Sequence, residues 1–213
     1  MSKNQLIIFS RFPSPGKAKT RLIPHLGKEK AALIHRELAE YTLHLVEGVK
    51  SKADLTPSPS VQISYQGESL EQFRQWLGDK HFYIEQPEGT LGEKLARTFQ
   101  SALNEGASRV LIIGTDCPEL TDSILNNAFF ELETKDLVLG PANDGGYYLI
   151  GLSSYYEELF QGIPWGGERV FAKTKQIADE LHISTAILPT LNDIDRPEDL
   201  HIWDKIKRQQ SAN

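Results

Sequence analysis

Segment 109–114, Arg-Val-Leu-Ile-Ile-Gly, constrains the fold of this chain more than any other stretch. It is a continuous aliphatic run, rich in β-branched residues, without the polar alternation of a strand that has one face in water. Such a run is typical of a strand buried on both faces, and strands of this kind belong to parallel sheets covered by helices. The sequence therefore predicts an α/β protein.

Short apolar runs and helical periodicities alternate along the rest of the chain, which favours a mostly parallel sheet with helices on both faces. We therefore expect a three-layer α/β/α fold and a single domain over residues 1–213. Pro57 and Pro59 predict an exposed loop over 55–60. Strands are predicted at 5–10, 61–65, 81–84, 109–114, 136–140, 147–152 and 185–188, and helices at 28–50, 70–77, 95–103, 121–132 and 170–181, with a last helix opened by Pro197.

Composition limits the classes of function. The net charge of −6 at pH 7 disfavours binding of nucleic acid through the overall field, although it allows a local basic pocket. Hydrophobic residues at 39 % and charged residues at 24 % indicate a globular chain. Cys117 is the single cysteine, which excludes a disulfide within the chain and a cysteine zinc site. The apolar run 6–9 is too short for a signal peptide or a membrane span, so we expect a soluble cytoplasmic protein.

The first predicted strand is followed by a basic loop. Ligands of parallel α/β sheets bind where strands end, so such loops are the places to look for function. This loop carries Arg11, Lys17, Lys19 and Arg21 around a turn made tight by Gly16 and two prolines. Backbone N–H groups and cationic side chains arranged in this way form a cradle for phosphate. A solvated basic turn is the alternative, and the spacing of a P-loop is absent.

Carboxylates follow two later strands. Asp116 comes just after the buried strand, where it can hold a hard divalent cation that in turn binds a diphosphate. A turn before Pro118 is the alternative. Asp193 and Asp195 are separated by one residue, so in an extended segment both side chains point the same way, which suits a shared metal. Capping of the following helix by Asp195 is the alternative.

Three glycine-containing segments are candidates for a substrate pocket. Gly145 and Gly146, beside Asp144, allow the backbone to approach a ligand closely, although Asp-Gly is also a strong signal for a hairpin turn. Trp165 precedes a helix and either stacks on a ring or fills the core. Gly92 either lets the chain pass a flat base or belongs to a plain turn before a helix. The six histidines show no HExxH spacing, so a histidine-metal hydrolase is disfavoured. The GxSxG nucleophile elbow and the GxGxxG motif do not occur either.

Five motifs occur in order between Phe9 and Leu200: FxRxPxPGxxKTRL, GTDCPxL, GPAxDGGYxLIGL, IPWG and DIDxPEDL. Together they resemble the bacterial GT-A-like nucleotide-diphospho-sugar transferases once catalogued as a domain of unknown function. These are also called radical-SAM/selenodomain-associated transferases or arsenosugar-biosynthesis glycosyltransferases. The chain is more distantly similar to the molybdenum-cofactor and phospholactate guanylyltransferases. The resemblance implies a single GT-A-like domain with a mixed central sheet.

The resemblance also implies roles for individual residues. Lys19 and Arg21 would bind the phosphates of the nucleotide. Asp116 would bind a divalent cation, Mg²⁺ or Mn²⁺, with Asp193 or Asp195 as the second ligand. The pocket for the sugar or the small-molecule acceptor would be bordered by Gly145, Gly146 and Tyr147. To these the residues considered above add Asp144, which can accept from a hydroxyl, and Trp165. Relatives often have Ser or Thr after the Trp-Gly pair, where this chain has Gly167 and therefore lacks a hydroxyl.

Three functions fit these observations. The first is a metal-dependent glycosyltransferase that uses a nucleotide-diphospho-sugar and releases a nucleoside diphosphate. The second is a nucleotidyltransferase, in which an acceptor phosphate attacks the α-phosphorus of a triphosphate and pyrophosphate leaves. The third is a nucleotide-binding module without turnover, which the presence of the whole cationic loop and all three aspartates disfavours.

Overall fold

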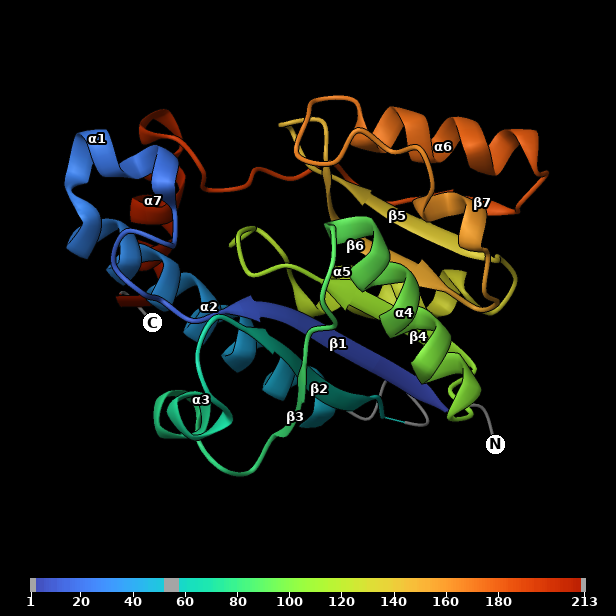
Figure 1. Cartoon of the computed structure of the whole chain (residues 1–213), viewed down its shortest axis with the longest axis horizontal. Coiled ribbons are helices and arrows are strands. Elements are labelled where there is room, and N and C mark those ends of the chain that lie inside the picture. The colour runs from blue at the N-terminus through green and yellow to red at the C-terminus, as the bar shows by residue number, and fades with distance from the viewer. Residues whose placement is uncertain (1–2, 52–57, 212–213) are drawn as a thin grey trace.

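One mixed sheet organises the computed structural model, which describes residues 3–51 and 58–211. The strand order is β3-β2-β1-β4-β6-β5-β7, and β6 alone runs antiparallel to its neighbours β4 and β5 (Figure 1). The expected mostly parallel sheet is thereby confirmed. The strands are β1 (Asn4–Arg11), β2 (Ser60–Gln66), β3 (Phe82–Glu85), β4 (Arg109–Ile113), β5 (Leu137–Pro141), β6 (Tyr147–Leu152) and β7 (Thr185–Ile187).

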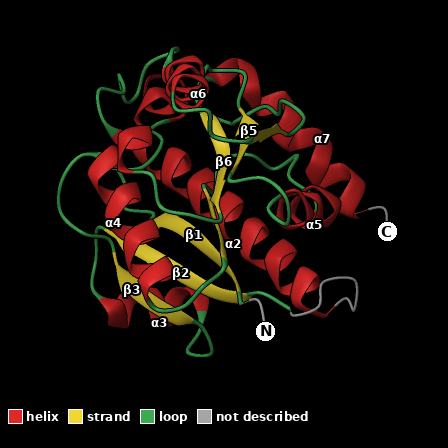
Figure 2. Cartoon of the chain, turned by 90° about the vertical axis from the view of Figure 1, so that its right-hand side faces the viewer, coloured by secondary structure: helices red, strands yellow, loops and turns green. Residues whose placement is uncertain are grey.

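Helices cover both faces of the sheet (Figure 2), as a three-layer fold requires. Core residues of α2, α3 and α5 pack on one face, and those of α4 and α6 pack on the other. The remaining long helix, α7, packs on α2 beyond the sheet (Figure 1). The bounds are α1 (Ile23–Leu26), α2 (Lys28–Ser51), α3 (Leu70–Leu77), α4 (Leu91–Asn104), α5 (Asp122–Glu131), α6 (Val170–Glu180) and α7 (Leu200–Ser211).

Strand β4 shows why the aliphatic run at 109–114 is not interrupted by polar residues. Successive side chains of a strand point to opposite faces. Leu111 and Ile113 therefore lie in the core under α2 and α5, while Val110 and Ile112 lie in the core under α4 and α6. Both faces of this strand are buried in the core, so residues 110–113 are all apolar.

Several local features differ from the sequence prediction. Three short segments carry no helical periodicity and were not predicted, namely the 3₁₀ turns Thr20–Leu22 and Glu157–Phe160 and helix α1. The predicted loop 55–60 lies outside the described residues up to 57, and at its end Ser60 already belongs to β2. Pro197 opens a 3₁₀ turn, Pro197–Asp199, that leads into α7. In the described part of the chain, no helix has the length and apolarity needed to cross a membrane.

The strand order places a crevice at the carboxyl ends of β1 and β4. From β1, the chain adds β2 and β3 on one side and β4 on the other, which makes the space between β1 and β4 a topological switch point. Open α/β sheets bind ligands outside the carboxyl ends of the strands at such a point. Because β6 is antiparallel, the β5–β6 turn also reaches this edge.

Candidate active site

The loop after β1 begins with a compact turn that carries the exposed cations Arg11 and Lys17. The amides of Lys17 and Ala18 donate to the carbonyl of Ser14 at 3.0 and 3.3 Å, and Gly16 adopts a positive φ of 84° that favours glycine. Arg11 donates to the carbonyl of Lys17 at 3.3 Å. The side chain of Lys17 is 67 % exposed and lies 3.8 Å from Glu68. Arg11 and Lys17 therefore present their charges at the surface of the loop.

Lys19 points inward. Its backbone is left-handed, with φ 47° and ψ 48°, and its side chain is only 3 % exposed. The ammonium lies 2.8 Å from Oδ1 of Asp116 and donates to the carbonyl of Ile194. The phosphate contact expected for this residue stays a prediction. In the structure Lys19 lines the cavity beside the loop, and its charge faces a carboxylate.

Asp116, directly beyond β4, has one covered and one open carboxylate oxygen. Oδ1 is buried, while the side chain as a whole is 47 % exposed. Burial alone would raise the pKa of Asp116, but the charge of Lys19 and the nearby His35 outweigh it and hold the pKa well below its usual range. The carboxylate is therefore ionised at neutral pH and offers an oxygen to the crevice.

His35 of α2 was not singled out from the sequence. Its ring is buried, with Nδ1 3.8 Å from Oδ1 of Asp116 and Nε2 2.9 Å from the carbonyl of Arg11. Because a carbonyl only accepts hydrogen bonds, Nε2 carries a hydrogen and donates it. His35 thus connects the start of the basic loop to the carboxylate, and its position in the middle of a helix gave no sequence signal for this role.

Asp193 and Asp195 flank Ile194, which is fully buried against Leu38 and Trp203. The carboxylate of Asp195 forms an ion pair with Arg21. It does not cap the following helix, because the residue before the 3₁₀ turn is Arg196 and the carboxylate of Asp199 accepts from the amides of Asp195 and Arg196. Arg21, like Lys19, is thus engaged by an aspartate.

Asp193 faces another carboxylate. Burial and the charge of Asp144 raise the pKa of Asp193 to about 6. Asp144 itself accepts a hydrogen bond from the amide of Gly146 at 2.7 Å, so this segment forms the tight turn between β5 and β6 that the sequence offered as an alternative. Asp193 has no ion pair with a basic side chain among the described residues.

Three cavities meet at this edge of the sheet. The first, the β1 cavity of about 520 Å³, is lined by the basic loop with Gln66, Gln86, Gly114 and Asp116. The second, the aromatic cavity of about 270 Å³, is lined by Leu91, Tyr147, Tyr148 and Trp165 together with Asp116, Asp144 and Asp193. Asp116 lines both cavities and stands at their junction.

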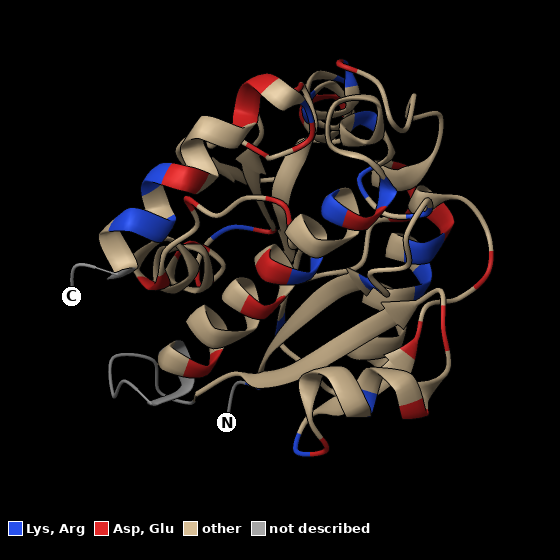
Figure 3. Cartoon of the chain, turned by 90° about the vertical axis from the view of Figure 1, so that its left-hand side faces the viewer, with Lys and Arg blue, Asp and Glu red and all other residues tan. Residues whose placement is uncertain are grey.

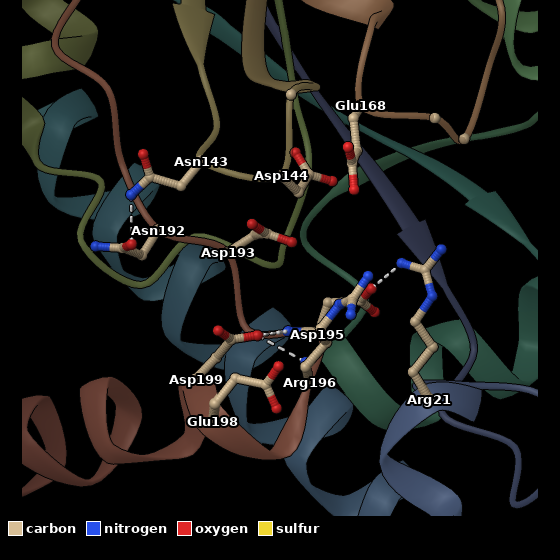
Figure 4. A pocket seen from close by; sticks show the side chains of 13 residues that line it. Arg21, Asn143, Asp144, Glu168, Asn192, Asp193, Asp195, Arg196, Glu198 and Asp199 are labelled. Carbon is tan, nitrogen blue, oxygen red and sulfur yellow. Dashed lines mark hydrogen bonds and ion pairs between the residues drawn. The ribbon is translucent and has the colours of Figure 1, made fainter.

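The third, the acidic cavity of about 570 Å³, opens beside the other two (Figure 4). Arg21 and Asp195 are shared with the β1 cavity, and Asp144 and Asp193 with the aromatic cavity. The carboxylates of Asp144, Asp193 and Glu168 face the same open space in Figure 4. The charged residues of its lining are Asp144, Glu168, Asp193, Asp195, Glu198 and Asp199 against Arg21 and Arg196.

The residues predicted for the pocket do not all line a cavity, and some of them pack within the cavity walls. The ring of Tyr147 packs edge-on to Trp165, with centroids 6.3 Å apart. Gly92 does not line the cavities. It packs directly against Trp165, where a Cβ would overlap the indole nitrogen. A side chain at Gly145 would overlap the backbone of Glu168. Gly92 and Gly145 therefore allow close packing of the cavity walls.

The three predicted metal ligands are only partly brought together. Among residues 3–51 and 58–211, no three His, Cys, Asp or Glu side chains already converge on one point as a metal site. Asp195 is engaged by Arg21, whereas Asp116, Asp144 and Asp193 share the lining of the aromatic cavity. The open oxygen of Asp116 and the repelling pair Asp144 and Asp193 are hard oxygen donors that suit Mg²⁺ or Mn²⁺.

Comparison with known proteins identifies the family. Residues 50–167 match the model described as "Uncharacterized protein conserved in bacteria (DUF2064)". A structure from Desulfovibrio desulfuricans G20, solved as a "putative nucleotide-diphospho-sugar transferase", is 30 % identical over 98 % of this chain and 98 % of that chain, with a TM-score of 0.84. The chain belongs to the DUF2064 family. The search of curated proteins gave no match.

More distant structures share the fold of this DUF2064 protein. CMP:2-keto-3-deoxy-manno-octonic acid synthetase complexed with CTP is 12 % identical, with a TM-score of 0.58 over 98 % of this chain and 100 % of that chain. Rv0371c from Mycobacterium tuberculosis H37Rv, in complex with manganese, is 13 % identical, with a TM-score of 0.51 over 97 % of this chain and 98 % of that chain. These likenesses confirm the fold of nucleotide-diphospho-sugar transferases and cytidylyltransferases.

Proposed function

We propose that this DUF2064 protein is a metal-dependent glycosyltransferase with a nucleotide-diphospho-sugar donor. The observation that carries the proposal is the separation of charge around Asp116. Basic residues line the β1 cavity, aromatic rings and carboxylates line the aromatic cavity, and carboxylates dominate the acidic cavity. The likeness to the Desulfovibrio structure and the motif resemblance to arsenosugar-biosynthesis glycosyltransferases support the same assignment.

The nucleotide fits the β1 cavity. Arg11 and Lys17 present exposed charges that can bind a phosphate. The amide side chains of Gln66 and Gln86 lie in the same lining and can hydrogen-bond a base. A diphosphate that starts at this loop would end beside Asp116, at the junction of the two cavities.

The sugar fits the aromatic cavity. Trp165, Tyr147 and Leu91 give it an apolar wall, and Asp144 and Asp193 place carboxylates that accept hydrogen bonds from hydroxyl groups. Apolar rings together with a few convergent polar groups are the usual lining of a small-molecule site. The acceptor would enter from the acidic cavity, which shares Asp144 and Asp193 with this one.

A divalent cation would be held by the open oxygen of Asp116 with Asp193 and Asp144. Mg²⁺ or Mn²⁺ bound there would stabilise the negative charge of the departing diphosphate. The manganese complex of the distant Mycobacterium tuberculosis structure supports a cation on this fold. This chain's contribution is to hold the carboxylates on three separate segments at one edge of the sheet.

The acidic cavity favours glycosyl over nucleotidyl transfer. In the glycosyl reaction an acceptor oxygen or nitrogen forms a bond to the anomeric carbon, and the nucleoside diphosphate leaves with the bonding electron pair. In the nucleotidyl reaction the acceptor is itself a phosphate. The six carboxylates of the cavity would repel such an anion, and one of its two arginines is already paired with Asp195. We therefore infer an uncharged or cationic acceptor.

The nucleotidyltransferase remains the second candidate because the first loop carries four cations, which suit a triphosphate, and because a fold neighbour was solved with CTP. The products separate the two. Release of nucleoside diphosphate supports glycosyl transfer, and release of pyrophosphate supports nucleotidyl transfer. Tight binding without consumption of any nucleotide, with every metal and acceptor tried, would leave a binding module.

A thermal-shift panel is the first test. Nucleoside mono-, di- and triphosphates and nucleotide-sugars are each added with Mn²⁺ or with EDTA. A ligand at about 100 times its Kd stabilises by about 2.7 kcal/mol, a shift of about 5–10 °C for a domain of this size. We expect the largest Mn²⁺-dependent shift with one nucleotide-sugar.

The matched variants for this panel are Asp116→Asn, which removes the charge at the cavity junction, and Asp79→Asn, which changes an exposed aspartate outside the three cavities. Asp116→Asn should lose the Mn²⁺-dependent part of the shift, and Asp79→Asn should keep it. Equal shifts in both variants would contradict the assignment of Asp116, and a shift with triphosphates alone would favour the nucleotidyltransferase.

A further inference from the structure

Lys19 is the best-buried charge of the candidate site. The side chain of Lys19 is 3 % exposed, whereas that of Lys17, two residues earlier in the same loop, is 67 % exposed. Lys19 and His182 are the two described non-glycine residues with a positive φ. A left-handed conformation is sterically unfavourable for a residue with a Cβ, so its retention requires compensating contacts. Those contacts are made by the side chain.

The ammonium joins three segments that are far apart in the sequence. It lies 2.8 Å from Oδ1 of Asp116 and donates to the carbonyl of Ile194. The amide of Ile194 in turn donates to the carbonyl of Asp116 at 2.9 Å. The basic loop, the end of β4 and the segment before α7 are thereby closed into one hydrogen-bonded ring. Asp193 and Asp195 sit on either side of the residue that Lys19 holds.

This ring decides which atoms remain open to a ligand. Because Lys19 covers Oδ1 of Asp116, and His35 faces the same atom at 3.8 Å, the second oxygen is the one that reaches the cavities. Because Lys19 fixes the carbonyl of Ile194, it also fixes where Asp193 leaves the backbone. Lys19 also lines the β1 cavity, but its ammonium is engaged by Asp116 and by the carbonyl of Ile194.

We propose that Lys19 is a positioning residue that orients Asp116 and Asp193 for a divalent cation, and that it does not contact the phosphates of the nucleotide. The cation itself rests on the function proposed above. The absence of a phosphate contact does not, because it follows from the burial and partners of Lys19. The two parts can therefore be tested separately in one protein.

The experiment measures the binding of pyrophosphate, the part shared by all nucleoside diphosphates, in EDTA and in Mn²⁺. Lys19→Met is compared with Arg11→Met, which removes an exposed cation of the same loop. In EDTA, Lys19→Met should change the Kd by less than about twofold, and Arg11→Met should weaken binding by about tenfold, the effect of one charge-assisted hydrogen bond. A tenfold loss in Lys19→Met would overturn the proposal.

In Mn²⁺, the sign of the change in Mn²⁺ affinity distinguishes a lysine that positions the carboxylates from one that only repels the cation. An ammonium that only repelled the cation would, once removed, tighten Mn²⁺ binding. A positioning lysine would, once removed, loosen it, so Lys19→Met should lose at least tenfold of the Mn²⁺ affinity measured by electron paramagnetic resonance without pyrophosphate. Unchanged or tighter Mn²⁺ binding contradicts the proposal.

Folding is checked by circular dichroism, because Lys19→Met leaves a buried carboxylate oxygen without its partner. If this variant does not fold, Lys19→Gln, which keeps an N–H donor in place of the ammonium, carries the same EDTA comparison. If the wild-type protein binds neither Mn²⁺ nor pyrophosphate, the proposed function fails together with this inference. If it binds both and Lys19→Met loses pyrophosphate in EDTA, only the inference fails.

Discussion

At the scale of single residues, the fold holds two carboxylates of like charge, Asp144 and Asp193, close to each other. Asp193 lies close enough to Asp144 for its pKa to rise to about 6, and burial is the larger cause of that rise. The unfolded chain has no such crowding, so an isolated aspartate titrates near 3.9. Ionising Asp193 therefore opposes folding, and a cation in the site would relieve that opposition.

We expect Asp193→Asn to stabilise the metal-free protein. A pKa raised in the folded state means that the folded protein holds the proton over a range where the unfolded chain has lost it. Stability is then full below about pH 4 and falls as the pH rises through about 6. At pH 7.5 the variant escapes this loss, and we expect a gain of about 1 kcal/mol, reduced for partial exposure.

Urea unfolding in EDTA at pH 7.5 and at pH 5 measures this effect. The gain should be smaller at pH 5, where the folded wild-type protein already holds the proton, and Asp79→Asn serves as the exposed control. A loss of stability in Asp193→Asn at pH 7.5 would show that Asp193 makes net favourable contacts without a cation.

At the scale of elements, the strands were predictable because their physical signal is strong. The aliphatic runs of β1 and β4 can be stable only where both faces are dry, and both strands were found at the predicted places. The predicted helix 121–132 corresponds to α5, and the hydroxyl of Thr121 at its start accepts from the amide of Ile124 at 3.3 Å. The three short turns and helices of three or four residues escaped prediction, because they are too short to show periodicity.

The contents of the site were predictable from the same loops, but the partners were not. The rule that ligands lie at strand ends brought the basic loop, Asp116 and Asp193 to one place. Nothing in the sequence marks Lys19 as left-handed, since lysine has no preference for a positive φ, and this conformation turns its charge inward. Arg21 and Asp195 pair across a separation of 174 residues, which no local pattern reveals.

Helix α7 contacts the segment that carries Asp193 and Asp195, because Trp203 packs against Ile194. This residue is 3 % exposed, lies in one cluster with Leu38 and Ile194, and donates from its indole to Glu37 of α2 at 3.0 Å. We expect Trp203→Ala to lower the free energy of unfolding by about 3–5 kcal/mol. Because Ile194 loses its cover, Mn²⁺ affinity should fall as well.

Trp203→Phe is the matched control, since it keeps most of the packing and loses only the indole donor. It should cost about 1 kcal/mol and leave Mn²⁺ binding close to that of the wild type. Equal Mn²⁺ affinity in Trp203→Ala and the wild type, in a folded sample, would show that the segment before α7 keeps its place without α7.

At the scale of the whole molecule, charge is mixed on the surface and sorted only inside the crevice. Figure 3 shows basic and acidic residues interspersed over the helices. The net charge is −6, so the positive charge of the basic loop acts locally, on a ligand small enough to enter the β1 cavity.

We therefore expect the protein to ignore long polyanions. It should pass through a heparin column at low ionic strength, and duplex DNA should not displace bound pyrophosphate, because the net negative charge of the protein repels an extended phosphate chain. Retention on heparin that weakens steeply with salt would instead reveal a basic face able to bind nucleic acid.

The ring formed by Lys19, Asp116 and Ile194 has a consequence for biosynthesis. Its members come from near the start, the middle and near the end of the sequence, and the last of them follows the final strand of the sheet. On the ribosome, all seven strands emerge before Ile194 does. A nascent chain can thus assemble its sheet first, while the carboxylates of the crevice reach their working arrangement only after Ile194 has followed the seven strands out of the ribosome.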